Sequence, residues 1–254
     1  MVDLLSALFL GIVQGLTEWL PISSSGHLVI VQQIMRMNVP LLFDVMLHFG
    51  TLLAVIVFFW KDILKILKNL FTLDFNSKEG KLIKFIIVGT IPVALIGLIF
   101  HDIIESLFSN LFAVGISLVI TGIILLLTKK SEGKKEMKLF DSILIGIAQA
   151  FALIPGISRS GTTISTGLFK GINKETVFKF SFLLSIPAVI AANLLELINN
   201  PITETDVLPL FVCVVTAAIM GYLSLKILYR MLKKGKFYYF SFYCFILGLL
   251  VLIY

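Results

Sequence analysis

Long apolar runs alternate with short polar loops along almost the whole chain. Six of these runs approach or reach the roughly 20 residues that an α-helix needs to cross a bilayer. They lie at 41–60, 82–100, 111–128, 175–195, 208–226 and 238–254. Recurrent runs of this length predict an all-α integral membrane protein with six transmembrane helices.

The charged residues gather in the loops, and they predict an orientation. Most of the lysines lie in three connecting loops, at 61–81, 129–138 and 226–236. Because cytoplasmic loops carry an excess of Lys and Arg, these three loops should face the cytoplasm. The loops at 101–110 and 196–206 are acidic or neutral and alternate with the basic ones, so they should face outside.

Two further segments, residues 1–40 and 139–174, have ends that this orientation constrains. The second follows a cytoplasmic loop and precedes an outward-going span, so it must enter and leave on the cytoplasmic face as a re-entrant helical hairpin. In the same form, the first would dip in from the opposite face. Charge leaves one alternative open, in which residues 3–19 cross completely and a surface segment follows.

The chain resembles itself at an offset of 135 residues. GIVQGLTEWLPISSSG, which begins at Gly11, then aligns with GIAQAFALIPGISRSG, which begins at Gly146. Identical residues coincide at Gly11/Gly146, Ile12/Ile147, Gln14/Gln149, Ile22/Ile157, Ser23/Ser158, Ser25/Ser160 and Gly26/Gly161. Each half then supplies one hairpin and three spans, which predicts an inverted-topology repeat within a single structural domain.

The predicted organisation has a first repeat at 1–128, a cytoplasmic linker at 129–140 and a second repeat at 141–254. Inverted repeats place their ligand site near the membrane midplane, where broken helices meet. The N-terminal segment contains Asp3 and has no basic region, so we expect it to stay in the mature protein rather than to be cleaved as a signal peptide.

Serines follow the Pro or Gly break in both repeats, at residues 23–25 and 158–160. Their hydroxyls are N-cap candidates for a second half-helix. Two half-helix N-termini that converge from opposite faces would direct N–H donors and positive dipole ends at one pocket. The pattern therefore favours an anionic ligand, and phosphate or two linked phosphates fit better than a lone carboxylate.

The repeats differ at their charged positions, where Glu18 aligns with Leu153, Ser24 with Arg159 and His27 with Thr162. Arg159 is expected to clamp a phosphate in bidentate fashion, although an arginine that reaches the cytoplasmic interface is the alternative. His27 could activate a serine hydroxyl or protonate a leaving oxygen, or it could simply begin a helix. Glu18 could bind a metal ion, pair with His27, or make a structural ion pair.

Other polar residues have two interpretations each. Gln14 and Gln149 suit a shared scaffold hydrogen bond as well as ligand contact. Asp44 and His48 have a spacing that could hold a metal ion on one helix face, but such a pair also starts helices. The set expected to bind substrate is Gln14, Ser25, Gly26, Ser158, Ser160, Gly161 and Thr162.

Composition narrows the function classes. The chain is 58% hydrophobic and 14% charged, and its net charge is +6. Because the lysines lie between apolar runs, they fit loops at a membrane rather than a nucleic-acid surface. Cys213 and Cys244 lie inside apolar runs without metal-ligand spacing, so we interpret both as packing residues.

The motifs GLTEWLPISSSGHL and PGISRSGTTI resemble those of the undecaprenyl pyrophosphate phosphatases associated with bacitracin resistance, and the match covers essentially the whole chain. The resemblance implies an integral enzyme of the bacterial inner membrane that removes the terminal phosphate of undecaprenyl diphosphate with a divalent cation, Mg²⁺ or Ca²⁺. It also implies a pocket open to the outer side, and it leaves a homodimer open. The residues on the family's active-site positions are Glu18, Ser23, Ser24, His27, Ser158 and Arg159.

One position departs from the family pattern. The first motif often begins with two glutamates, whereas Gln14 stands first here, so the motif supplies a single carboxylate, Glu18. The expected mechanism is in-line attack on the terminal phosphorus by Ser24, preferred over Ser23, or by water. In it His27 manages protons and Glu18 positions the metal ion.

Two rival functions remain to be weighed. A transporter or flippase would use the same inverted-repeat architecture. The acid-phosphatase-like lipid phosphatases share serine-glycine-histidine and serine-arginine signatures, but they need an Arg-Pro dipeptide and a later histidine. The chain contains no Arg-Pro dipeptide, and no histidine follows Arg159.

Overall fold

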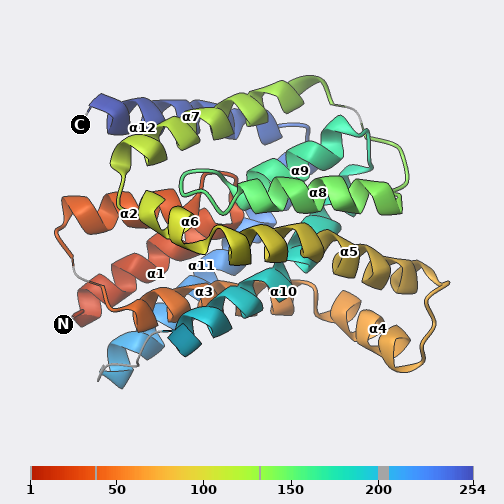
Figure 1. The fold of residues 1–254 in the computed structure, drawn as a ribbon, viewed down its shortest axis with the longest axis horizontal. Helices are drawn as coiled ribbons and strands as arrows, with labels where there is room; N and C mark the ends of the chain where they lie inside the picture. Colours follow the sequence, from red (N-terminus) through yellow and green to blue (C-terminus); the bar gives the residue numbers. More distant parts are fainter. Residues whose placement is uncertain (1, 38, 132, 200–205, 254) are drawn as a thin grey trace.

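The computed structural model describes residues 2–37, 39–131, 133–199 and 206–253, and the regular structure of these residues is helical (Figure 1). The α-helices are Leu4–Trp19 (α1), Ser24–Ile34 (α2), Leu41–Phe58 (α3), Trp60–Phe71 (α4), Lys78–Ile99 (α5), His101–Leu107 (α6), Leu111–Leu127 (α7), Leu139–Phe151 (α8), Arg159–Phe169 (α9), Lys174–Asn199 (α10), Val207–Lys233 (α11) and Phe240–Ile253 (α12). Two 3-10 turns lie at Thr128–Lys130 (η1) and Phe237–Tyr239 (η2).

Four helices, α5, α7, α10 and α11, are long and apolar enough to cross a membrane. The helices α3 and α4 meet at an angle of 81° and make a fifth candidate if they are counted as one span. These candidates coincide with five of the six predicted spans, and they make the chain a multi-pass membrane protein.

The sixth predicted span, 238–254, is not among these candidates. The 3-10 turn η2 and helix α12 together cover Phe237–Ile253, which falls short of the roughly 20 residues that a span needs. Tyr254 and most of the predicted outer loop at 196–206 lie outside the described residues.

Both segments predicted to be re-entrant consist of two short helices with a break between them. Helix α2 contacts α1, and α9 contacts α8 (Figure 1). Helices α2 and α9 have 11 residues each and begin at Ser24 and Arg159, the positions that align at the 135-residue offset. The predicted breaks are therefore present in both halves of the chain.

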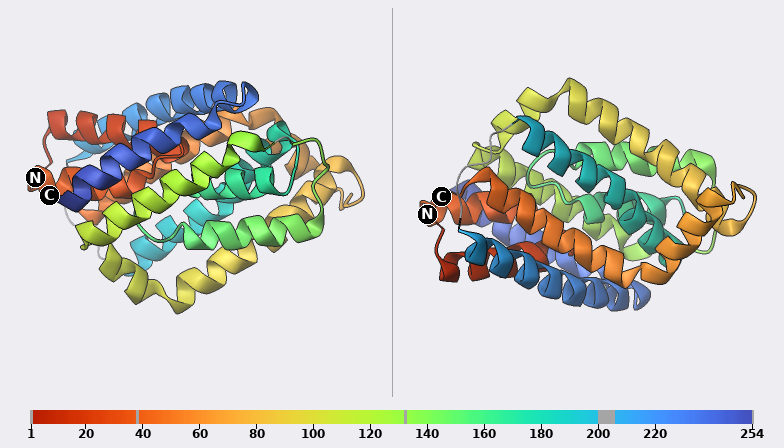
Figure 2. Two further views of the ribbon diagram at one scale, coloured as in Figure 1. Left: turned by 90° about the horizontal axis from the view of Figure 1, so that it is seen from above. Right: turned by 90° about the horizontal axis from the view of Figure 1, so that it is seen from below.

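The packing partners of the helices exchange between the two halves. Helix α1 packs on α11, and its counterpart α8 packs on α5; likewise α3 packs on α11, and α10 packs on α5. Helices α7 and α12 lie side by side (Figure 2). Helices α1, α3, α5 and α7 of the first half thus each contact a helix of the second half.

Two of these contacts depend on glycine. A Cβ atom added at Gly146 of α8 would lie 2.2 Å from the carbonyl oxygen of Gly89 on α5. A Cβ atom added at Gly15 of α1 would lie 2.7 Å from the carbonyl oxygen of Ala217 on α11. Small residues at such contacts let membrane helices approach closely enough for van der Waals packing.

The largest buried cluster contains aromatic residues from α1, α3 and α10. Trp19, at the end of α1, is fully buried and meets Phe182 edge-on with ring centroids 5.4 Å apart. Phe178 packs on Phe182 at 4.7 Å. This cluster fixes the end of α1, and it therefore fixes the position of Glu18, the neighbour of Trp19.

Helix α4 is an amphipathic insertion in the predicted cytoplasmic loop 61–81. Its lysines recur at Lys61, Lys65 and Lys68, on the helix face opposite its leucines. Asp62 accepts a hydrogen bond from Lys179 Nζ at 2.7 Å, which ties α4 to α10. An amphipathic helix at a sharp angle to a span is suited to lie in the membrane interface.

Both cysteines pack as predicted. Cys213 and Cys244 are free and fully buried. Their thiols donate to the carbonyl oxygens of Leu210 and Pro21 at 3.1 and 3.6 Å.

Candidate functional site

The two helix breaks make the same capping hydrogen bonds. Ser23 is the N-cap of α2, and its hydroxyl accepts the backbone N–H of Gly26 at 3.3 Å. Ser158 is the N-cap of α9, and its hydroxyl accepts the N–H of Gly161 at 3.1 Å. Hydroxyl pairs repeat as well, at 3.2 Å for Ser23 and Ser25 and at 3.3 Å for Ser158 and Ser160. The predicted serine caps are therefore confirmed in both repeats.

Helix α7 holds the second break in place. The hydroxyl of Thr121 donates to the carbonyl oxygen of Gly156 at 3.0 Å and accepts the N–H of Ser158 at 3.2 Å. Gly156 has a φ of 93°, and a Cβ atom there would lie 2.6 Å from the carbonyl oxygen of Val114. Only glycine allows this loop to approach α7 so closely without strain.

Ser23 differs from its repeat partner in backbone conformation. Its φ is 67°, in the left-handed region, whereas Ser158 has a φ of −77°. A residue other than glycine in this region is uncommon, and such conformations collect at functional sites. The first break is therefore the strained one of the two.

Glu18 is the point at which the two repeats meet. Its carboxylate accepts hydrogen bonds from the Ser24 hydroxyl and from Nη2 of Arg159, the first residues of α2 and α9. Gln14, one turn earlier on α1, donates from Nε2 to Glu18 Oε2 at 3.0 Å. The structure thus brings Gln14, Glu18, Ser24 and Arg159 together at the helix breaks.

Arg159 points into the protein and not toward an interface. Its guanidinium carbon lies 4.8 Å from the centre of the Trp19 ring, a cation–π contact. The Arg159 side chain is 18% exposed and that of Glu18 is 6% exposed. Trp19 therefore supports the guanidinium as well as packing on Phe182.

His27 has partners other than those expected. Its Nδ1 donates to the carbonyl oxygen of Ser23 at 2.7 Å, so Nε2 accepts the hydroxyl proton of Tyr243 at 2.7 Å. The two rings stack with centroids 5.6 Å apart. Among the hydrogen bonds of the described residues, none joins His27 to Ser24 or Glu18. Tyr243 lies 216 positions away on α12, and no sequence signal pointed to it.

His48 lies beside Glu18, whereas the Asp44 carboxylate contacts a different residue. His48 Nε2 lies 3.8 Å from Glu18 Oε2, while Nδ1 donates to the carbonyl oxygen of Asp44 at 2.8 Å. The Asp44 carboxylate instead accepts Gln32 Nε2 at 3.3 Å. The two side chains therefore do not converge on one point, although their sequence spacing allowed a shared metal ion.

The protein oxygens at the site are too few to enclose a metal ion. Across the described part of the chain, no group of three His, Cys, Asp or Glu residues could hold one. The cluster offers the Glu18 carboxylate and the buried, unpartnered Oε1 of Gln14. Mg²⁺ takes about six oxygen ligands and often keeps several from water and substrate phosphates. These residues fit a cation that a bound phosphate helps to hold.

The second repeat contributes mainly scaffold. Ser158, Ser160 and Thr162 are at most 5% exposed, and Thr162 donates to the carbonyl oxygen of Ser158 at 3.0 Å. Gln149, the counterpart of Gln14, is buried with both amide atoms unpartnered. Ser24, Ser25 and Arg159 are partly exposed. A ligand therefore reaches Ser24, Ser25 and Arg159 more easily than Ser158, Ser160 and Thr162.

The chain matches a protein family over nearly its whole length. The sequence profile of the family described as "Bacitracin resistance protein BacA" matches residues 7–250. A protein named undecaprenyl-diphosphatase from Methanosphaera stadtmanae is 40% identical over 100% of this chain and 98% of its own length. Proteins of the same name from Carboxydothermus hydrogenoformans and Caldicellulosiruptor bescii are 44% and 43% identical, each over 97% of this chain and 95% of its own length. The chain belongs to the bacitracin resistance protein BacA family.

Proposed function

We propose that this protein is an undecaprenyl-diphosphatase, which hydrolyses undecaprenyl diphosphate to undecaprenyl phosphate and phosphate and so recycles the lipid carrier of cell-wall synthesis. One observation carries the proposal: Ser24 and Arg159, which begin two half-helices from different repeats, bind the same carboxylate. Relatives that are 40% and 44% identical to this chain carry the name undecaprenyl-diphosphatase, which supports the proposal.

The Glu18 carboxylate marks where the terminal phosphate binds. It is an anion held by an arginine and by a hydroxyl at a helix N-terminus, and a phosphate oxygen suits the same donors. When substrate enters, Arg159 turns from Glu18 to the phosphate. This exchange leaves Glu18 free to accept a proton from Ser24, whose hydroxyl already donates to it.

Ser24 is the nucleophile in this proposal. Its oxygen attacks the terminal phosphorus in line with the bridging oxygen, the bond from phosphorus to that oxygen breaks, and undecaprenyl phosphate leaves. The serine proton passes to Glu18. Water then releases phosphate from the serine. Ser23 is less suited because it is buried and its hydroxyl caps α2. Direct attack by water is the alternative, and it predicts no phosphoserine.

His27 is one turn beyond Ser24 and acts on the leaving group. It is partly exposed, and its Nε2 bonds only to the mobile proton of the Tyr243 hydroxyl. A proton delivered from this pair to the bridging oxygen would assist departure of undecaprenyl phosphate. This role replaces the expected activation of serine by His27, since Glu18 is the residue bonded to Ser24.

A divalent cation, Mg²⁺ or Ca²⁺, would accompany the substrate. Among the described residues, Arg159 is the only Lys or Arg paired with Glu18, so the site's own charges nearly cancel. A diphosphate adds at least two negative charges. Glu18 and Gln14 Oε1 would hold the cation together with phosphate oxygens, and the cation would neutralise charge on the phosphates when bound.

The arrangement in the membrane is part of the proposal. Six spans and two re-entrant hairpins form an inverted-topology repeat in the bacterial inner membrane, with the site open to the outer side. The exchanged packing partners of α1 and α8 and the equal lengths of α2 and α9 support it. In a variant lacking both native cysteines, an impermeant thiol reagent should label Ser109→Cys in intact cells and Lys134→Cys only after lysis. The reverse result would contradict this orientation.

Phosphate release by the purified protein in detergent tests the activity. Wild type should release phosphate from undecaprenyl diphosphate, and Arg159→Ala should lose at least about 10²-fold in kcat, because the developing charge loses its clamp. Arg230→Ala serves as the control, because it removes an arginine in the last turn of α11 instead of the one paired with Glu18. A transporter or flippase would release no phosphate in detergent and would need two compartments to show activity.

A further inference from the structure

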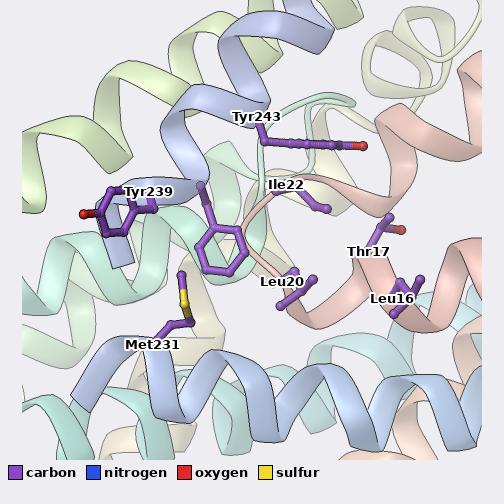
Figure 3. Close-up of a pocket in the computed structure, with 8 residues that line it drawn as sticks. Leu16, Thr17, Leu20, Ile22, Met231, Tyr239 and Tyr243 are labelled. Atoms are coloured by element: carbon purple, nitrogen blue, oxygen red, sulfur yellow. The ribbon is translucent and has the colours of Figure 1, made fainter. Parts of the chain in front are cut away.

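An apolar pocket of about 470 Å³ lies beside the site (Figure 3). It is bounded by the end of α1 and the break after it, by the end of α11, and by η2 and the start of α12. The lining residues are Leu16, Thr17, Leu20, Ile22, Met231, Tyr239, Phe240 and Tyr243. Thr17 uses its hydroxyl on the carbonyl oxygen of Val13, so the hydroxyl is not free for a ligand.

Two residues that line the pocket are chain neighbours of candidate site residues. Thr17 precedes Glu18 in the chain, and Ile22 precedes Ser23. Tyr243 belongs to both places, because its ring lines the pocket while its hydroxyl donates to His27 Nε2 at 2.7 Å. A molecule with a polar head at Ser24 and an apolar tail could therefore occupy the site and the pocket together.

We propose that this pocket binds the first isoprene units of the prenyl diphosphate and that Tyr243 is the residue that links their binding to the position of His27. The inference rests on the proposed function and names a subsite for the substrate's tail. It assigns a specificity role to residues of α11 and α12, at the opposite end of the chain from the serine motif.

The size and chemistry of the pocket fit such a tail. If each carbon takes the ~30 Å³ that a water molecule occupies in the liquid, the pocket holds about 15 carbons, or about three isoprene units. Its walls are leucine, isoleucine, methionine and aromatic rings. Tyr239 and Tyr243 are each 45% exposed, so the pocket has an opening at α12 through which a longer chain can continue into lipid.

Tyr243 acts as a positioning residue. Its ring stacks on the His27 imidazole, with 8° between the planes, and its hydroxyl bonds to the same imidazole. A tail that packs on the other side of the ring holds it in this orientation. His27 is then fixed toward the bridging oxygen only when a prenyl group fills the pocket, so the tail should affect turnover as well as affinity.

A substitution that fills the pocket tests the tail site. Met231→Trp should raise KM for farnesyl diphosphate at least about 10-fold, since even one methylene in an apolar pocket is worth about 10-fold or more. It should leave kcat/KM for methyl diphosphate within about twofold. The control Ile227→Trp adds the same ring at a 45% exposed position of α11, outside the pocket. Equal losses on both substrates, or unchanged KM for farnesyl diphosphate, would overturn the tail site.

The Tyr243 hydroxyl has its own test. Tyr243→Phe keeps the ring in the pocket wall and removes the bond to His27, so KM for farnesyl diphosphate should stay within about twofold while kcat falls and its pH profile changes. Tyr222→Phe removes a tyrosine hydroxyl of α11 that lies outside the pocket lining, and it should leave both parameters unchanged. A Tyr243→Phe enzyme with wild-type kcat and pH profile would remove Tyr243 from this role.

Binding can be measured without turnover. A farnesyl diphosphate with a photoreactive diazirine on its third isoprene unit should crosslink to the peptides that contain Met231 and Tyr239, and inorganic diphosphate should not prevent labelling completely. Crosslinks confined to other helices would refute the pocket even if the enzyme is active. If wild type releases no phosphate from any diphosphate but these crosslinks form, the proposed function fails while the tail site stands.

Discussion

The ion pair between Glu18 and Arg159 connects the two repeats, and a double-mutant cycle measures its strength. Arg159→Met keeps the length of the side chain and removes its charge, whereas Glu18→Gln keeps shape and removes the opposite charge. The Glu18 side chain is only 6% exposed, so Arg159→Met leaves an uncompensated buried carboxylate. Breaking a buried pair in this way costs about 3–5 kcal/mol of unfolding free energy.

We take the lower end, about 3 kcal/mol, because Ser24 and Gln14 still donate to the carboxylate. Glu18→Gln should cost only about 1–2 kcal/mol, since Arg159 is partly exposed and keeps its contact with Trp19. The double variant has no unpaired charge and should resemble Glu18→Gln. The coupling energy is therefore about 3 kcal/mol.

Unfolding by SDS in mixed micelles, followed by tryptophan fluorescence, gives the four free energies. The Asp62–Lys179 pair, whose side chains are 31% and 42% exposed, is the matched control and should show a coupling of about 1 kcal/mol or less. Coupling below about 0.5 kcal/mol for Glu18 and Arg159 would refute the conclusion that this pair joins the repeats.

Three further predictions concern chemistry and packing. Ser24→Ala should lower kcat at least about 10³-fold, and mass spectrometry of the quenched wild-type enzyme should find phosphoserine in the Ser24 peptide; full activity in Ser24→Ala would eliminate the covalent route. Chelation of divalent cations should abolish phosphate release, and Mg²⁺ or Ca²⁺ should restore it; a fully active chelated enzyme would contradict the cation proposal. Gly146→Ala should destabilise the protein by about 3 kcal/mol because its Cβ meets the Gly89 carbonyl oxygen at 2.2 Å. Gly97→Ala, whose nearest neighbour would be a Leu153 methyl at 3.5 Å, should be within about 1 kcal/mol of wild type, and equal effects of the two substitutions would count against close α5–α8 packing.

Properties that depend on neighbouring residues could be predicted from the sequence. Hydropathy located five of the spans, and Ser23 and Ser158 located the starts of α2 and α9. A helix cap needs only a hydroxyl and an N–H three residues away, so its signal is complete within a few positions. The sixth predicted span was not confirmed, because residues 237–239 form a 3-10 turn and the α-helix α12 begins only at Phe240, which apolar composition alone does not show.

The membership of the candidate site could be predicted only in part. Glu18, Ser24 and Arg159 were identified individually, and the repeat indicated that two of them start equivalent helices. Their convergence on one carboxylate joins residues 141 positions apart, and it depends on how the two repeats pack. No local pattern encodes that distance.

The partner of His27 illustrates the same limit. Its spacing from the serines suggested that it activates one of them, and the choice between Ser24 and Tyr243 could not be made from spacing. In the structure, α12 packs on α7 and brings the Tyr243 hydroxyl to the imidazole. The Arg159–Trp19 contact arises in the same way, from a second-repeat helix that reaches the end of α1.

By itself, the sequence determined that the chain is helical and membrane-bound, because this follows from the transfer of apolar side chains to lipid. It also determined where the two helix breaks lie and which hydroxyls cap the half-helices that follow them, because a cap is a bond within one helical turn. Only the tertiary structure decided that Glu18 is the centre of the site, that His27 bonds to Tyr243, and that an apolar pocket adjoins them. Those features depend on contacts between helices distant in sequence, which close packing alone brings together.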